Sequence, residues 1–288
     1  MNKRKKTRWT SALLGLFLAA SMVLGIGPKA MAADTAPNPS VTVHDLQGLL
    51  SAIETTDAGG IIGVDAEIMV TSGTTLGTFT KGITIQRVTA DGHLQFHSDD
   101  GTGDPITANN VVFDGAGVSA STPFVGVDLD STIEGCTFKN CTAVYSGGGL
   151  SIDRGQIQLT GCTFKDNSTE NQGGSLYISG GVTATLENCT FTGGSAAYKG
   201  GAMMNGGTCT ITNSTITGNH AGQYGGGIYN YGTLTVEGCK IYQNTADEGG
   251  ADLANEGNGQ IDLKDDLSTL VALFAPDSLI PSGWTTEN

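Results

Sequence analysis

The chain has 288 residues, of which 44 are glycine and 15% are charged, and its formal net charge is −14 at pH 7. The glycine content is about twice the usual share, but glycine does not recur at every third position, which excludes collagen. Apolar residues recur in an ordered pattern, which excludes a disordered chain. The acidic charge argues against nucleic acid and anionic membrane surfaces as partners.

Residues 1–32 have the pattern of a signal peptide. A basic stretch from Lys3 to Arg8 precedes an apolar stretch from about Ala12 to Ile26, and Ala30-Met31-Ala32 offers small residues for cleavage after Ala32. An uncleaved membrane anchor is the alternative. Six of the 14 Lys and Arg residues precede residue 33, so eight basic residues remain against 28 acidic ones, a net charge of −20. We therefore expect a secreted or surface-associated bacterial protein without stable membrane insertion.

A short helix is expected before the repeats begin. Residues 33–42 are small and polar and predict a flexible lead-in. Across residues 43–58 the apolar side chains recur at helical spacing, and Gly59-Gly60 ends the pattern. Repeat proteins close the ends of their core with such caps, so this helix is predicted to cover the first coil. Its apolar positions are Val43, Leu46, Leu49, Leu50 and Ile53.

Residues 59–263 contain two motifs that repeat with one period near 25 residues. The first is a Gly-Gly-small-apolar tetrad that begins at Gly147, Gly173, Gly200 and Gly225, with a degraded copy at Gly249. The second places a small residue and an apolar residue two positions apart. Its members are Cys136 and Phe138, Cys162 and Phe164, Cys189 and Phe191, Ser214 and Ile216, and Cys239 and Ile241.

This double repeat predicts an all-β fold, a right-handed parallel β-helix with about eight coils between Ile61 and Leu263. Apolar residues two positions apart place one face of each strand toward the core. Glycine or asparagine directly precedes the small residue of the second motif in each coil and predicts a turn with left-handed backbone. These turn residues are Gly135, Gly161, Asn188, Asn213 and Gly238. A leucine-rich horseshoe is the alternative, but its consensus is missing. Residues 264–288 predict a C-terminal cap or linker.

The tetrads alternate with Phe164-Lys165-Asp166-Asn167, Ile216-Thr217-Gly218-Asn219 and Ile241-Tyr242-Gln243-Asn244. Over about residues 131–263 this pairing resembles the repeats of the bacterial polymorphic outer-membrane proteins. It also resembles right-handed parallel β-helix surface proteins in general. The resemblance implies a cell-surface, adhesin-type role.

Four of the six cysteines share one ladder position, which Ser214 occupies in the remaining coil. An exported protein with six cysteines suggests disulfides, but side chains in register on parallel strands point the same way and suit the disulfide dihedral poorly. We favour a buried ladder of free thiols, with disulfides as the alternative. No histidine lies at ligand spacing from these cysteines, so we expect no metal site and no cofactor.

No catalytic residues are assigned. Enzymes with this fold, such as pectate lyases and polygalacturonases, use carboxylate clusters, whereas the outward acids here, including Asp128 and Asp153, look scattered. We expect no two carboxyl groups to share one face in adjacent coils. Asp153-Arg154 is interpreted as a solvated turn pair. A polysaccharide lyase or glycoside hydrolase remains an alternative function.

Five tyrosines beside the tetrads are the candidate ligand-binding residues. They are predicted to form an exposed aromatic strip that binds a glycan or a cell-surface protein, since aromatic side chains stack on sugar rings and anchor protein partners. The alternative is that these tyrosines stack on one another and only cover the edge of the sheet. The protein would then be a structural spacer. The five are Tyr145, Tyr177, Tyr198, Tyr224 and Tyr229.

Overall fold

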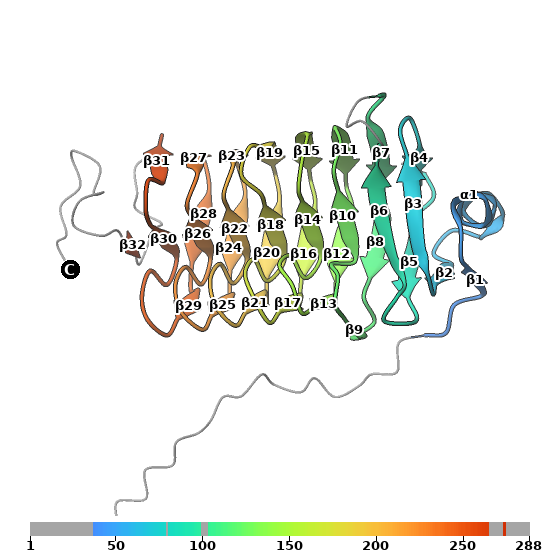
Figure 1. Ribbon diagram of the computed structural model, residues 1–288, viewed down its shortest axis with the longest axis horizontal. Helices are drawn as coiled ribbons and strands as arrows, with labels where there is room; N and C mark the ends of the chain where they lie inside the picture. The colour runs from blue at the N-terminus through green and yellow to red at the C-terminus, as the bar shows by residue number, and fades with distance from the viewer. Residues whose placement is uncertain (1–36, 79, 99–102, 265–272, 275–288) are drawn as a thin grey trace, which may run out of the picture. The chain divides into compact units, whose positions relative to one another are not determined.

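The computed structural model describes residues 37–78, 80–98, 103–264 and the backbone of 273–274. The predicted signal peptide lies outside the described residues, as do residues 33–36 of the lead-in and most of the predicted C-terminal segment. The chain winds through successive coils, and the strands at equivalent positions of neighbouring coils pair in parallel (Figure 1). The predicted parallel β-helix is confirmed.

Four sheets form the walls of the described coils, and each is named here by its position or content. The phenylalanine sheet has nine strands: β1 (Val41–Val43), β2 (Ile61–Val64), β5 (Ile83–Arg87), β8 (Val111–Asp114), β12 (Thr137–Lys139), β16 (Thr163–Lys165), β20 (Thr190–Thr192), β24 (Thr215–Thr217) and β28 (Lys240–Tyr242). The cleft sheet also has nine: β3 (Glu67–Thr71), β6 (His93–His97), β10 (Val125–Val127), β14 (Leu150–Ile152), β18 (Leu176–Ile178), β22 (Met203–Asn205), β26 (Ile228–Asn230), β30 (Leu253–Asn255) and β32 (Leu273–Phe274).

The other two sheets complete each coil. The threonine sheet contains β4 (Thr75–Leu76), β7 (Ile106–Asn109), β11 (Ser131–Glu134), β15 (Gln156–Thr160), β19 (Thr183–Glu187), β23 (Thr208–Thr212), β27 (Thr233–Glu237) and β31 (Gln260–Leu263). The corner sheet contains β9 (Ser119–Ala120), β13 (Thr142–Ala143), β17 (Ser168–Thr169), β21 (Ser195–Ala196), β25 (His220–Ala221) and β29 (Thr245–Ala246).

The solenoid has about nine coils where eight were predicted, because strand pairing begins before the helix. Val43 was expected at the start of the helix but lies in β1, which pairs with β2. The helix α1 covers Leu46–Thr55, and the Asp45 side chain caps it by accepting a hydrogen bond of 2.7 Å from the Gly48 backbone N–H. Leu49 and Ala52 are buried against the first coil, so the helix caps the apolar core (Figure 1).

A stack of phenylalanines runs through the core. Phe113, Phe138, Phe164 and Phe191 lie in register, with ring centroids 4.9, 4.8 and 4.5 Å apart. These distances match the spacing of paired strands, so strand pairing itself brings the rings into contact. Ile216 and Ile241 continue the column in the next two coils.

The thiol column lies beside this stack and contains Cys136, Cys162, Cys189, Ser214 and Cys239, and all six cysteines of the chain carry thiols and not disulfides. The Cys189 backbone N–H donates to the Ser214 hydroxyl at 3.0 Å, and the Ser214 N–H approaches the Cys239 sulfur at 3.4 Å. Ser214 therefore replaces a thiol without leaving its hydroxyl unpaired, since that hydroxyl donates to the Thr212 carbonyl. Burial raises the pKa of the Cys136 thiol to about 12.

Glycine recurs in the tetrads because the backbone requires it. Gly173 has a φ of +68°, in the left-handed region that side chains disfavour. Gly174 is packed so closely that a Cβ atom there would lie 2.1 Å from the Gly201 carbonyl oxygen of the next coil. The predicted left-handed turns are also confirmed, with φ of +54° at Asn188 and +51° at Asn213.

We predict that Phe164→Ala lowers the free energy of unfolding by about 3–5 kcal/mol, because it leaves a cavity between two stacked rings. Urea denaturation measures the change. Tyr231→Ala is the control, since Tyr231 is 52% exposed. A loss below about 1 kcal/mol for Phe164→Ala would contradict the stack's role in stability.

The thiol column also predicts a pH dependence of stability. The pKa of Cys136 is raised from 9.0 to about 12 on folding, so the unfolded chain loses this proton first as pH rises. The contribution of the protonated Cys136 thiol to the free energy of unfolding is complete below pH 9 and is lost as pH rises toward 12. In urea titrations across this window, Cys136→Ala should show a shallower fall in unfolding free energy than the native chain. Equal slopes would be the contrary result.

Candidate ligand cleft

The outer face of the cleft sheet changes character along the coils. Its central column runs through Gln95, Gly126, Ser151 and Tyr177 on β6, β10, β14 and β18, in register. Met204 and Tyr229 then continue it on β22 and β26. Before Gln95 the column begins with Met69 on β3. It is thus polar and small in its middle and apolar at both ends, and the hollow lies over the polar part.

A cleft of about 400 Å³ lies over β6, β10, β14 and β18. The central column forms its floor. One flank comes from the segments that precede the strands and contains Thr122, Pro123, Tyr145, Ser146 and Asn171. The other flank comes from the residues that follow the strands, Asp153 and Ser179. His93 lies at one end of the cleft. The lining is therefore a set of hydroxyl, amide, carboxyl and aromatic groups from four successive coils.

Two acidic residues occupy equivalent positions at the strand ends of adjacent coils. Asp128 and Asp153 directly follow Val127 and Ile152, which pair in register. Sequence inspection missed the pair because no Gly-Gly tetrad precedes Val125, so this coil was not aligned with the next one although the two aspartates are 25 residues apart. The Asp153 side chain accepts a hydrogen bond of 3.3 Å from the Ser179 hydroxyl and lines the cleft.

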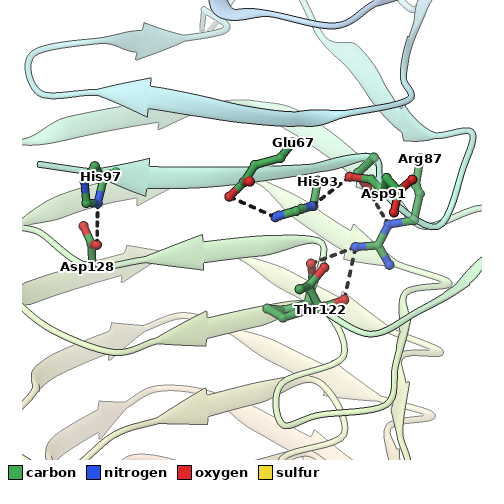
Figure 2. Close-up of polar contacts among 9 residues, drawn as sticks. Glu67, Arg87, Asp91, His93, His97, Thr122 and Asp128 are labelled. Atoms are coloured by element: carbon green, nitrogen blue, oxygen red, sulfur yellow. Dashed lines mark hydrogen bonds and ion pairs between the residues drawn. The ribbon is translucent and has the colours of Figure 1, made fainter.

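Asp128 is already occupied by protein partners. His97 Nδ1 lies 2.6 Å from its carboxylate (Figure 2), and Arg154 contacts the same oxygen at 3.3 Å. Its other oxygen accepts a hydrogen bond from the Ser98 backbone N–H at 3.3 Å. Arg154 was interpreted as the partner of Asp153, but it pairs across the coils with Asp128. Asp153 therefore carries the carboxylate that faces the cleft.

His93 is held at the entry end of the cleft. Its Nδ1 lies 2.9 Å from the Asp91 carbonyl oxygen, and its Nε2 lies 3.5 Å from the Glu67 carboxylate (Figure 2). The side chain is 14% exposed. Contacts on both ring nitrogens fix the orientation of the imidazole, so His93 forms a rigid end to the cleft.

Arg87 fastens the cleft flank from inside the protein. Its guanidinium is fully buried and donates to the carbonyl oxygens of Thr122 at 3.2 Å and Pro123 at 2.7 Å (Figure 2). Further bonds reach the carbonyls of Gly92 and Thr142, and the guanidinium carbon lies 5.0 Å from the centroid of the Phe124 ring. Burial lowers the pKa of this guanidinium. Arg87 thus joins three coils beneath the cleft.

The five candidate tyrosines differ in their exposure and in the groups around them. Tyr145, 64% exposed, and the half-buried Tyr177 line the cleft. Tyr198 is exposed outside it. Tyr229 was expected to be exposed but is buried, because Met204, Ala254, Tyr177 and Tyr224 pack around it.

Tyr224 and Tyr229 surround a lysine instead. Lys199 Nζ lies 5.7 and 4.5 Å from their ring centroids, and it contacts the Glu256 carboxylate at 2.7 Å. Tyr229 also donates a hydrogen bond to Glu256. Hydrogen bonds from Lys199 and Tyr229 lower the pKa of the Glu256 carboxyl. This cluster joins neighbouring coils and has a structural role.

Sequence reasoning missed Gln95, Ser151, Asn171 and Arg87. Glycine within the strand at Gly126 was the available signal, because glycine in a strand interior often marks close approach by a ligand or another backbone. Among the described residues, no group of three or more His, Cys, Asp or Glu side chains is arranged to hold a metal ion. None of the helices in the described segments could cross a membrane.

Residues 149–263 match the family model described as a right handed beta helix region. The match covers the regular coils almost entirely and supports the right hand predicted for the solenoid. The chain is thus built around a right-handed parallel β-helix. A search of curated proteins found no match.

We predict that Arg87→Met destabilises the fold by about 3 kcal/mol or more, because it leaves buried carbonyl oxygens without donors. Arg154→Met is the matched control. Its side chain is 62% exposed, and loss of its surface ion pair should cost about 1 kcal/mol or less. Urea denaturation of both variants provides the comparison. Similar losses in the two variants would show that Arg87 does not fasten the coils.

Proposed function

We propose that the protein binds a neutral glycan in the cleft on the outer face of the cleft sheet. The observation that supports this most is the lining itself, in which hydrogen-bonding side chains and tyrosines from four successive coils surround about 400 Å³. Sugars present hydroxyl groups at their edges and apolar C–H groups on their faces. Amide, hydroxyl and carboxyl groups suit the edges, and Tyr145 and Tyr177 suit the faces.

The charges of the cleft favour a neutral ligand over an acidic one. Asp153 lines the cleft and Asp128 lies beside it, whereas the described lining includes no lysine or arginine. An anionic sugar would be repelled by these carboxylates and would find no lysine or arginine in the lining to pair with. Galacturonan and similar acidic polymers are therefore the disfavoured class.

The size of the cleft favours a glycan over a protein ligand. Its volume lies in the range of small-molecule sites, about 300–1,000 Å³, whereas a protein partner requires a larger and flatter area. The floor crosses four coils, which are about 14 Å apart from first to last. We propose that a short stretch of a linear glycan lies across the strands, along the direction in which the coils stack.

The proposed setting is the outside of a bacterial cell. The signal-peptide pattern of residues 1–32, the acidic mature charge and the likeness of the repeats to polymorphic outer-membrane proteins support an exported, adhesin-like role, either secreted or surface-associated. In this role the solenoid is a rigid support that presents the cleft to a glycan of another cell or of the surrounding matrix. A spacer without a ligand would not require a polar cleft.

Hydrolysis of the bound glycan is the second candidate function, and the neighbouring carboxylates Asp128 and Asp153 favour it. Glycoside hydrolases place two carboxyl groups across the bond that they cleave. Binding without cleavage fits better, because Asp128 is already held by His97, Arg154 and the Ser98 N–H. A lyase acting on an acidic polymer fits the charges less well.

We predict that residues 33–288 are retained by at least one neutral polysaccharide in affinity electrophoresis and by no acidic one. Tyr177→Ser should weaken retention at least about tenfold by removing a stacking surface. Tyr231→Ser is the matched control, because Tyr231 is exposed and lies outside the cleft. Retention by acidic polymers alone, or equal retention of the two variants, would contradict the proposal.

Mass spectrometry of the incubated polysaccharides separates the two candidate functions. Unchanged polymer supports a binding protein. New oligosaccharides with added water would show hydrolysis, and unsaturated ends would show lysis.

A further inference from the structure

We propose that Gln95 is the specificity-determining residue of this cleft and that its amide binds a pair of adjacent hydroxyl groups on a neutral sugar ring lying over Gly126. This inference rests on the proposed glycan-binding function and deepens it. It assigns one side chain to one feature of the ligand. The observations that support it are the missing side chain at Gly126, the position of the Gln95 amide and the groups on either side.

Gly126 contributes no side chain to the central column of the floor. Each neighbouring coil places a side chain there, with Gln95 before it and Ser151 after it. Glycine within a strand is destabilising relative to alanine. Close approach by a ligand or by other atoms is the usual reason for such a glycine.

The Gln95 amide fills the space that a side chain at position 126 would take. A Cβ atom on Gly126 would lie 2.2 Å from Gln95 Oε1, 3.0 Å from its Cδ and 3.3 Å from its Nε2. All three amide positions are thus close to one point above the glycine. The amide therefore lies across the floor of the cleft.

Within the described part of the chain, the Gln95 amide has no hydrogen-bond partner, and its atoms keep contact with solvent. Another partly buried amide is used by the protein, since Asn140 donates to the Asp114 carboxylate at 3.1 Å. A half-buried amide without a protein partner gains most from a ligand that supplies one. Its position on the cleft floor directs this capacity toward the ligand.

The chemistry of the amide identifies the ligand feature. A primary amide offers one acceptor oxygen and two N–H donors side by side, and each sugar hydroxyl both donates and accepts. Two adjacent hydroxyls can therefore donate to Oε1 and accept from Nε2 at the same time. Ser151 supplies a further hydroxyl on the far side of Gly126, and Tyr177 lies one coil beyond it.

The test compares Gln95→Ala, Gln95→Glu and Gly126→Ala by calorimetric titration with the neutral polysaccharide that the native chain retains. We expect each variant to weaken binding at least about tenfold, because the amide is removed, loses its donors or is displaced by the new methyl group. Gln158→Ala is the matched control, since Gln158 is exposed on β15 of the threonine sheet. Thermal unfolding of each variant verifies that the fold is retained.

A second measurement uses the ligand alone. Periodate cleaves carbon–carbon bonds between adjacent hydroxyl-bearing carbons, so the oxidised polysaccharide should no longer compete with the native polymer for the native chain. Continued competition would overturn the inference.

The outcomes separate this inference from the proposed function. If Gln95→Ala binds like the native chain while Tyr177→Ser binds weakly, the role of Gln95 is wrong and the glycan-binding cleft stands. If the native chain binds no neutral polysaccharide, both fall together. Loss of binding in the Gln95 and Gly126 variants, with an intact Gln158→Ala control, supports the inference.

Discussion

Register between parallel strands is the constraint on which this structure depends. Coils of nearly equal length place equivalent residues in line about 4.8 Å apart, so any side chain that recurs in the sequence becomes a column in space. The phenylalanine stack, with centroids 4.5–4.9 Å apart, and the thiol column beside it follow directly. The same register continues to the outer face. There it brings Asp128 beside Asp153 and Gln95 beside Gly126, although long stretches of sequence separate them.

The candidate site forms where the side chains in the central column of the cleft sheet are small. Toward the C-terminal coils the outer column of the cleft sheet is filled by Met204 and Tyr229, which pack with Tyr224 and Lys199 and leave little free surface. Toward the N-terminal coils it contains Gly126 and Ser151, and a hollow remains. The buried guanidinium of Arg87 holds one flank of that hollow through backbone carbonyls. A rigid scaffold thus presents a preformed cleft, which limits the entropy that a flexible ligand must lose against it.

The fold could be predicted from the sequence because its core columns repeat. Cys162 and Phe164 recur one coil later as Cys189 and Phe191, and a period shared by two motifs leaves few architectures. The cleft could not be predicted in the same way. Gln95 and Gly126 pair although they are 31 residues apart, whereas Gly126 and Ser151 are 25 apart, so the irregular coils hide the register. The tyrosine strip was wrong in part because outward direction does not ensure exposure, as Tyr229 shows.

The most direct test of this account is a crystal structure of the chain with a short oligosaccharide cut from the neutral polysaccharide that it retains. The account predicts a sugar ring over Gly126, with adjacent hydroxyls on the Gln95 amide and a ring face against Tyr145 or Tyr177. Sugar bound elsewhere, such as on the threonine sheet or beside Lys199, with the cleft free of sugar, would contradict it.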